Sequence, residues 1–300
     1  MTEALEPAAE RRAAAAVLEV LLAAGCREIR LPQWLDYDRA REDLGRSGVN
    51  ACKFVAPDGR VMMLLPDPTL GVLQVLPAAG RPARVCYWAD AFRVIDGEWV
   101  RRPQVGAELL GYPSRRADPE VLLLALDAVA AAGCRRVRLV LNDAGLTDGL
   151  CSLLPSSAAG RARLALAAGD FVELERAAAG QAWLADALRF AGPVIDLRRR
   201  LAGGQLPEAV SARLAHLEWL SGAVRERRPD ADILLDAGMV REIGYYDGLV
   251  FQLIEQGTGR VLAAGGRYDG LVGEGCPGGA GFACDVAALA AAAGTGGDAR

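Results

Sequence analysis

Two apolar segments joined by a short glycine-containing turn constrain the fold of this chain more than any other feature. The first segment runs from Tyr246 to Ile254 and the second from Val261 to Ala264, with Gln256-Gly257-Thr258-Gly259 between them. Two glycines in so short a connection are typical of a β-hairpin. Because an isolated hairpin is only marginally stable in water, the remaining chain must supply further strands or helices to cover it.

Hydrophobic periodicity predicts both helices and strands outside this hairpin, without a regular β-α-β alternation. Strands are expected at residues 26–31, 60–65, 136–141 and 233–235. Helices are expected at residues 8–24, 118–133 and 282–292. In the second helix Asp118 is interpreted as the N-cap and Pro119 as the first helical residue, with Gly133 at the end.

Residues 151–228 differ from the rest, because they are rich in alanine and leucine with interspersed arginines. Helices are expected there at residues 174–179, 182–190 and 209–224. We interpret residues 151–228 as a helical insertion in a discontinuous core of residues 1–150 and 229–300. Hairpins and helices in separate blocks indicate an α+β fold with an antiparallel sheet flanked by helices.

Composition excludes several classes of protein. With 52% hydrophobic and 24% charged residues among 300, the chain is a packed globular protein and not a disordered one. A net charge of −4 argues against a strongly basic nucleic-acid binder. The seven cysteines form no C-x-x-C pair and His216 is the only histidine, so we expect buried reduced thiols and no metal site. No apolar run reaches the about 18 residues of a membrane span, and we expect a cytoplasmic protein.

Two motifs flank the predicted hairpin. Val240 to Phe251 reads Val-Arg-Glu-Ile-Gly-Tyr-Tyr-Asp-Gly-Leu-Val-Phe, and Gly265 to Leu271 reads Gly-Gly-Arg-Tyr-Asp-Gly-Leu. In this order they resemble the two histidine-signature motifs of histidyl-tRNA synthetase and its relatives. The resemblance implies a class II aminoacyl-tRNA synthetase core.

Further segments resemble other motifs of the same family. Ala91-Phe92-Arg93 and the segment 104–111 are similar to class II motif 2, and Leu65 to Thr69 is similar to the turn that binds the amino group. Ile29 to Pro32 resembles motif 1, and Gly279 to Ala283 resembles the start of motif 3. Because the class II core pairs through motif 1, the resemblance implies a homodimer formed around Ile29 to Leu35.

The departures from the family pattern indicate which relative this is. Ala287 and Ala288 stand where a working synthetase has the Glu-Arg of motif 3, and Arg102-Pro103 stands where motif 2 has Phe-His. Loss of the phosphate-binding arginine would cost several powers of ten in rate. The sequence ends at Arg300, so no anticodon-binding domain is expected. We therefore expect no aminoacylation and no tRNA partner.

A synthetase core with these departures resembles the regulatory subunit of ATP phosphoribosyltransferase. The resemblance implies a non-catalytic subunit in a hetero-oligomer with a short catalytic chain, which it activates at the first step of histidine biosynthesis while taking part in histidine feedback. A truncated synthetase-like enzyme that forms histidyl-adenylate remains an alternative. So does a histidine sensor with another partner.

The resemblance also assigns residues to an L-histidine site, and it implies no cofactor. Asp67, Thr69 and Gln104 would bind the ligand ammonium, while Glu108 and Tyr246 would meet the imidazole nitrogens. Arg241 would face the ligand carboxylate, and Tyr245 and Tyr268 would line the pocket. Arg93 corresponds to the phosphate-binding arginine of motif 2, and without its motif 3 partner we interpret it as a salt-bridge residue.

Overall fold

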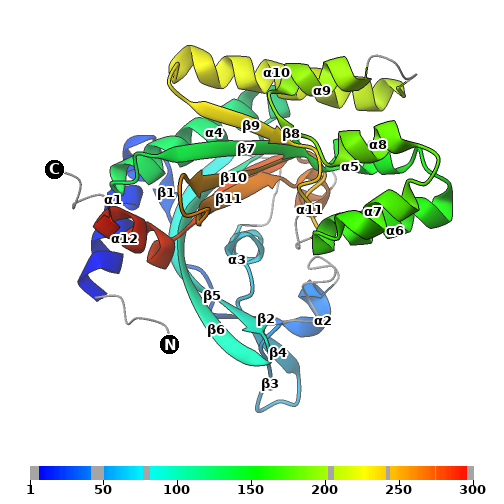
Figure 1. Ribbon diagram of the computed structural model, residues 1–300. Helices are drawn as coiled ribbons and strands as arrows, with labels where there is room; N and C mark the ends of the chain where they lie inside the picture. Colours follow the sequence, from blue (N-terminus) through cyan, green and yellow to red (C-terminus); the bar gives the residue numbers. More distant parts are fainter. Residues whose placement is uncertain are drawn as a thin grey trace. The chain divides into compact units, whose positions relative to one another are not determined.

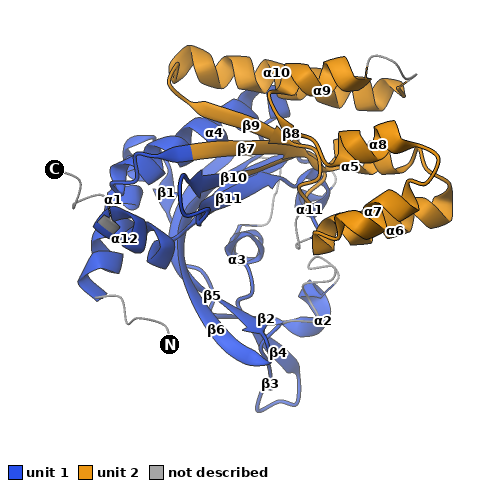
Figure 2. Ribbon diagram, in the orientation of Figure 1, with its two compact units in different colours: residues 1–137, 243–245, 252–300 blue, residues 138–242, 246–251 orange. Residues whose placement is uncertain are grey.

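The structure, a computed structural model, describes residues 7–41, 51–76, 82–201, 206–240, 244–273 and 275–295. The chain forms two compact units (Figure 2). Unit 1 contains residues 1–137, 243–245 and 252–300, and unit 2 contains residues 138–242 and 246–251. The chain therefore enters unit 2 twice, at residues 138 and 246, and returns to unit 1 for the last time within strand β10.

Unit 1 contains most of the strands (Figure 1). Its helices are α1 (Pro7–Ala23), α2 (Tyr37–Ala40), α3 (Pro68–Val75), α4 (Ser114–Ala131), α11 (Asp269–Val272) and α12 (Val286–Thr295). Its strands are β1 (Arg27–Glu28), β2 (Trp34–Asp36), β3 (Lys53–Val55), β4 (Val61–Leu64), β5 (Ala83–Ile95), β6 (Glu98–Leu110), β11 (Val261–Arg267), β12 (Gly279–Asp285) and the end of β10 (Leu249–Glu255).

The main sheet of unit 1 has the strand order β1-β5-β6-β12-β11-β10. Strand β1 is parallel to β5, whereas β5, β6, β12 and β11 pair antiparallel in that order. A separate three-stranded sheet has the order β2-β4-β3. The hairpin expected from the sequence is confirmed as β10 and β11, and Gly257 and Gly259 adopt the left-handed conformation in its turn, with φ of 98° and 73°.

The longest pairing in unit 1 is a second hairpin, β5–β6, in which Ile95 pairs with Glu98 across the two-residue turn Asp96-Gly97. Both turn residues have positive φ, 51° and 82°, which is the type I′ geometry that Asp-Gly favours. Figure 1 shows α3 on the concave side of this long, bent hairpin and α1 and α12 on its other side.

Helix α1 packs against both α4 and α12, and all three helices pack against strands of unit 1. The apolar faces of these helices are buried, including Val17 and Leu21 of α1 and Val121 and Leu122 of α4. They form the hydrophobic core on one side of the sheet and leave the other side to the polar residues described below.

Three local predictions are corrected. Helix α4 begins at Ser114, four residues before Asp118, because the amides of Arg116 and Ala117 already bond to the carbonyl of Pro113. Phe282 belongs to strand β12, and helix α12 starts only at Val286, where Asp285 accepts a hydrogen bond from the amide of Ala288. The strand expected at residues 26–31 is reduced to Arg27–Glu28.

Unit 2 is mainly helical. Its helices are α5 (Ala144–Cys151), α6 (Ser156–Ala168), α7 (Phe171–Ala177), α8 (Ala182–Leu188), α9 (Val194–Leu201) and α10 (Glu208–Arg227). The three helices expected near residues 174, 182 and 209 are confirmed as α7, α8 and α10. In the sheet, the strand next to β10 is β7 (Val137–Asp143), followed by β9 (Asp232–Asp236) and β8 (Ala191–Gly192).

The fold class is confirmed as α+β, but the sheet is mixed and not antiparallel throughout. Strand β7 runs parallel to β9, as β1 does to β5. Helices α6 to α10 occupy most of residues 156–227, and the division into a core and an insertion at 151–228 stays a prediction.

Six of the seven cysteines are buried, Cys276 is partly buried, and all seven are free thiols. Burial raises the pKa of the thiols of Cys134 and Cys151 to about 11, which keeps them protonated and unreactive near neutral pH. None of the helices in the described part of the chain has the length and apolar character needed to cross a bilayer.

Candidate functional site

A polar cluster lies on the face of the unit 1 sheet opposite α1 and α4. Alternation along β6 places Gln104, Gly106 and Glu108 on this face. In the neighbouring strands Tyr87 of β5 is paired with Gly106, and Gly281 of β12 is paired with Glu108. Strand register therefore brings an acid, an amide and a phenol together from segments far apart in the sequence.

Glu108 is the centre of this cluster and is only 1% exposed. The hydroxyl of Thr69 donates to its Oε1 at 2.8 Å, and that of Tyr87 donates to the same oxygen at 3.3 Å. The hydroxyl of Tyr268 donates to Oε2 at 2.5 Å. The hydrogen bonds from these three hydroxyls hold the carboxyl group in one orientation.

Asp67 extends the cluster at the start of α3. Its Oδ1 accepts from the backbone amide of Thr69 at 3.0 Å, as a helix N-cap does, and from the hydroxyl of Tyr245 at 2.9 Å. Nη2 of Arg93 lies 3.6 Å from its Oδ2. The rings of Tyr245 and Tyr268 meet edge to face at 5.8 Å, which links the Asp67 and Glu108 ends of the cluster.

Glycines make this close approach possible. A Cβ on Gly281 would lie 1.6 Å from Oε2 of Glu108, because the carboxyl group lies directly over the backbone of β12. A Cβ on Gly106 would lie 2.1 Å from the carbonyl oxygen of Phe282 and 2.8 Å from the hydroxyl of Tyr87. Both positions therefore require glycine for packing, not for backbone conformation.

Burial raises the pKa of Glu108 to about 8. Desolvation is the main cause, the hydrogen bonds from Tyr268 and Thr69 oppose it, and the neighbouring carboxylate of Asp67 adds to it. Glu108 is thus mostly protonated near neutral pH and can donate a proton as well as accept a hydrogen bond.

The raised pKa makes the stability of the protein depend on pH. Between about pH 4.5 and pH 8 the folded chain holds a proton that the unfolded chain releases, so the free energy of unfolding falls as the pH rises. For this group alone the slope is about −1.4 kcal/mol per pH unit. Urea unfolding at about pH 6 and about pH 7.5 should show wild type losing about 2 kcal/mol more than Glu108→Gln. Equal losses in the two proteins would contradict the raised pKa.

The structure brings together most of the predicted ligand residues. Direct contacts connect five of them: Asp67, Thr69, Glu108, Tyr245 and Tyr268. Arg93 forms the expected ion pair, and its partner is Asp67. Whether they bind histidine stays a prediction.

Three predicted residues remain: Gln104, Tyr246 and Arg241. Gln104 shares the face of Glu108, and its Oε1 is buried without a hydrogen-bond partner among the described residues. Tyr246 is half-buried and belongs to unit 2. Arg241 lies outside the described residues.

Sequence reasoning missed Tyr87, which is 1% exposed and donates to Glu108. The signal was present in Asp96-Gly97, because a two-residue type I′ turn fixes the register of the whole hairpin. Counting back from that turn places Tyr87 opposite Gly106, next to Glu108 on the same face.

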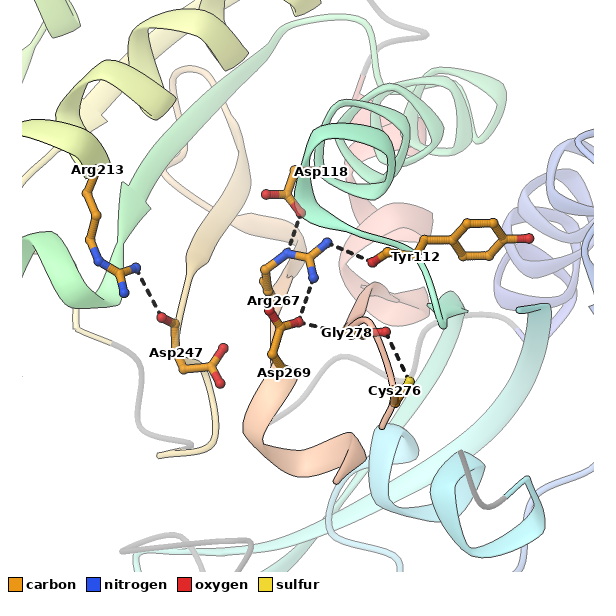
Figure 3. A network of polar contacts seen from close by, with 9 residues as sticks. Tyr112, Asp118, Arg213, Asp247, Arg267, Asp269, Cys276 and Gly278 are labelled. Carbon is orange, nitrogen blue, oxygen red and sulfur yellow. Dashed lines mark hydrogen bonds and ion pairs between the residues drawn. The ribbon is translucent and has the colours of Figure 1, made fainter. Parts of the chain in front are cut away.

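Arg267, in the second signature motif, is buried on the other face of the sheet, at 4% exposure (Figure 3). Its Nε donates to Oδ1 of Asp118 in α4 at 2.7 Å, and its Nη1 donates to Oδ1 of Asp269 at 2.5 Å. Its Nη2 donates to the carbonyl of Tyr112 at 3.4 Å. Because Arg267 and Tyr268 are adjacent, this network fixes the position from which Tyr268 reaches Glu108.

In unit 2 the arginines are mostly paired with acids. Arg213 of α10 donates to Oδ1 of Asp143 at 2.6 Å. It also donates to the carbonyl of Asp247 at 3.1 Å (Figure 3). Arg198, Arg199 and Arg200 form ion pairs with Glu218, Asp196 and Asp186. These pairs leave less free positive charge for a nucleic-acid surface, in agreement with the acidic total.

The comparisons with known proteins match the motifs. The sequence profile of the histidyl-tRNA synthetase family matches residues 1–289. The ATP phosphoribosyltransferase regulatory subunit of Moorella thermoacetica is 31% identical over 319 aligned positions, which cover 96% of this chain and 79% of that protein. The chain belongs to this family of regulatory subunits.

Solved structures agree on the class II synthetase fold of this family. An ATP phosphoribosyltransferase regulatory subunit/histidyl-tRNA synthetase from Bacillus halodurans superposes with a TM-score of 0.85 at 21% identity, covering 97% of this chain and 81% of that chain. A chain from the ATP phosphoribosyltransferase complex of Thermotoga maritima gives 0.70 at 18% identity, covering 91% and 95%.

In this chain the start of α12 differs in charge from the motif 3 helix of a working synthetase. Asp285 accepts from the amide of Ala288, so a carboxylate caps the helix, and the expected Glu-Arg positions carry methyl groups at Ala287 and Ala288. This helix start therefore offers no side-chain cation to a triphosphate. Among the described residues no three His, Cys, Asp or Glu side chains are grouped to bind a metal ion.

Proposed function

We propose that this chain is the non-catalytic subunit that activates a short catalytic ATP phosphoribosyltransferase at the first step of histidine biosynthesis and takes part in its feedback by histidine. The observation that carries the proposal is an assembled polar cluster around Glu108 together with Ala287 and Ala288 at the motif 3 positions. In this proposal the cluster acts as the ligand-recognition half of a synthetase-like site, and the two alanines replace a phosphate-binding element. The names of the relatives and of the Thermotoga maritima complex support the same partner.

The cluster in unit 1 offers chemistry suited to L-histidine, and Arg241 and Tyr246 complete the proposed set from the sequence. Asp67 supplies an anion for the ligand ammonium, and the unpartnered Oε1 of Gln104 supplies a further acceptor. Glu108, which can hold or release a proton near neutral pH, suits an imidazole that does the same. Arg241 would meet the carboxylate and Tyr246 an imidazole nitrogen.

Linkage between histidine and the catalytic chain is the proposed mechanism of control. If the two bind this subunit with coupled affinities, histidine shifts the complex away from the conformation in which the catalytic chain is fast. A coupling of about 1–3 kcal/mol, typical of such systems, changes the affinity of one partner about 5- to 150-fold when the other is bound. No chemical step is assigned to this chain.

Self-association and location are part of the same proposal. Trp34, within the segment 29–35 proposed for the dimer, is 54% exposed on β2, and Val55 and Val61 are exposed on the same small sheet. The strand register places Val55 and Val61 on the opposite face of this sheet from Trp34, so the proposed dimer contact rests on Trp34 within the segment 29–35. A cytoplasmic location is proposed because the pathway is a biosynthetic one.

The test mixes purified protein with the short catalytic chain from the same source and follows phosphoribosyl-ATP formation. We expect the rate to rise on mixing, and the gain to fall when histidine is added. A matched Glu108→Gln complex should keep the activation and lose part of the response to histidine. No rate change and no co-elution would overturn the proposal, and histidine-dependent pyrophosphate exchange by this chain alone would favour the adenylate-forming enzyme.

A further inference from the structure

Arg213 of α10 joins two segments of unit 2 that lie far apart in the sequence. Its Nη1 donates to Oδ1 of Asp143 at 2.6 Å. The same nitrogen donates to the carbonyl oxygen of Asp247 at 3.1 Å (Figure 3). Asp143 ends strand β7, and Asp247 follows Tyr246 in the first signature motif. One guanidinium nitrogen therefore connects the end of a buried strand to the segment that carries a predicted ligand residue.

A close contact between α5 and α10 fixes the place of this guanidinium group. Gly145 and Gly149 lie one turn apart on α5 and face α10. A Cβ on Gly145 would lie 2.3 Å from Cζ of Arg213, and a Cβ on Gly149 would lie 2.6 Å from Cγ2 of Val210. Asp143 is the N-cap of α5, and its side chain is only 4% exposed. The guanidinium group therefore lies directly over the Gly145 backbone, beside a carboxylate that the helix start holds in place.

The backbone that follows Tyr246 depends on these contacts. Tyr246, Asp247 and Gly248 precede β10 and belong to no helix or strand. The carbonyl of Gly248 accepts from the amide of Ala144 at 2.9 Å, and the carbonyl of Asp247 accepts from Arg213. Two successive carbonyl groups are thus bonded to the start of α5 and to α10. Because no strand ladder holds these residues, the two hydrogen bonds fix the point from which the Tyr246 side chain leaves the backbone.

We propose that Arg213 is a positioning residue of the histidine site, because it fixes the backbone from which Tyr246 meets the ligand imidazole. The inference rests on the proposed function, which assigns Tyr246 to an imidazole nitrogen. A hydroxyl hydrogen bond requires a donor-to-acceptor distance of about 2.5–3.0 Å, so a small shift of the backbone is enough to weaken it. Arg213 thus acts on the ligand through Tyr246, with its own Nη1 engaged by Asp143 and Asp247.

The test is a double-mutant cycle, in which calorimetric titration of the full chain with L-histidine measures the affinity of each variant. Tyr246→Phe removes the hydroxyl and should weaken binding about 2- to 10-fold, as the loss of one hydrogen bond does. Arg213→Gln should weaken binding to a similar extent in wild type, yet change the affinity of Tyr246→Phe less than about 2-fold. Arg213→Lys, which keeps a cation beside Asp143, should restore part of the affinity.

Gly145→Ala tests the same contact without removing the guanidinium group. The added Cβ must push the end of the Arg213 side chain aside, away from its place over the backbone. Binding of L-histidine should therefore fall, while the midpoint of urea unfolding changes less than in Arg213→Gln, since a cation for the buried Asp143 is still present. Gly222→Ala in α10 is the matched control, because a Cβ there meets nothing within 4 Å. It should leave the affinity unchanged.

Losses in Arg213→Gln and Tyr246→Phe that multiply in the double variant would show that Arg213 does not act through Tyr246. The inference would then fail while the proposed function stands. Unchanged affinity in Gly145→Ala would overturn it as well, and this variant decides if Arg213→Gln does not fold. If wild type does not bind L-histidine, the histidine site of the proposed function is wrong and the inference fails with it. Activation of the catalytic chain, measured separately, tests the rest of the proposed function.

Discussion

Replacing Asp118 with asparagine is expected to lower the free energy of unfolding by about 3 kcal/mol. Asp118 and Arg267 are 1% and 4% exposed as side chains, and their contact of 2.7 Å lies between α4 and the end of β11. Removing the carboxylate leaves a guanidinium largely out of water with only Asp269, which is 46% exposed, as an anionic partner. The buried charge, and not the lost hydrogen bond, causes most of the loss.

Urea denaturation measures this effect, and Asp232→Asn is its matched control. Asp232 pairs with Arg138 at 2.8 Å, but the two side chains are 38% and 45% exposed. Solvent screening keeps such a pair to within about 1 kcal/mol. Equal losses in the two variants would show that burial of the Arg267 network does not matter. Because Arg267 precedes Tyr268, Asp118→Asn should also weaken binding at the Glu108 cluster.

Gly281→Ala is expected to disrupt the candidate site and to destabilise the protein by about 3 kcal/mol. The new Cβ would lie 1.6 Å from Oε2 of Glu108 and 2.6 Å from the carbonyl oxygen of Ala107. The backbone oxygen cannot move without shifting β6, and the carboxyl group cannot move without breaking its hydrogen bonds to Tyr268 and Thr69. Ligand binding should therefore fall together with stability.

Gly160→Ala is the control for this substitution. Gly160 lies in helix α6 and a Cβ there meets nothing within 4 Å, so alanine should stabilise the protein by about 0.5–1 kcal/mol. A double variant Gly281→Ala, Glu108→Ala tests the cause directly. Since the closer clash is absent without the carboxyl group, whereas the contact with the Ala107 carbonyl remains, the two losses should be less than additive. Additive losses would show that Gly281→Ala acts through the backbone alone.

Local signals predicted the elements whose structure is set within a few residues. The turn at Gly257 and Gly259 identified the β10–β11 hairpin, because its left-handed residues carry their own sequence signature. The helices near Pro7 and Glu208 followed from apolar periodicity. The family motifs went further, since they named five residues that the structure places in contact.

Asp118 shows where local reasoning failed. Its sequence context, Asp before Pro, is that of an N-cap, and a local argument can give no other answer. In the fold it lies inside α4 and neutralises Arg267, a partner 149 residues away. The tertiary partner outweighs the local preference, because a buried arginine needs a counter-charge more than a helix needs one additional cap.

The amino-acid order alone was enough for the α+β fold class, the signature motifs and the identity of the residues around Glu108 other than Tyr87. Only the tertiary structure decided how those residues meet. Tyr245 reaches Asp67 across 178 residues, and Tyr87 reaches Glu108 through the register of a hairpin. Such contacts, and the protonation of Glu108 that follows from its burial, depend on which strands pair and in what register. Those are properties of the whole packed sheet, and no short window of sequence contains them.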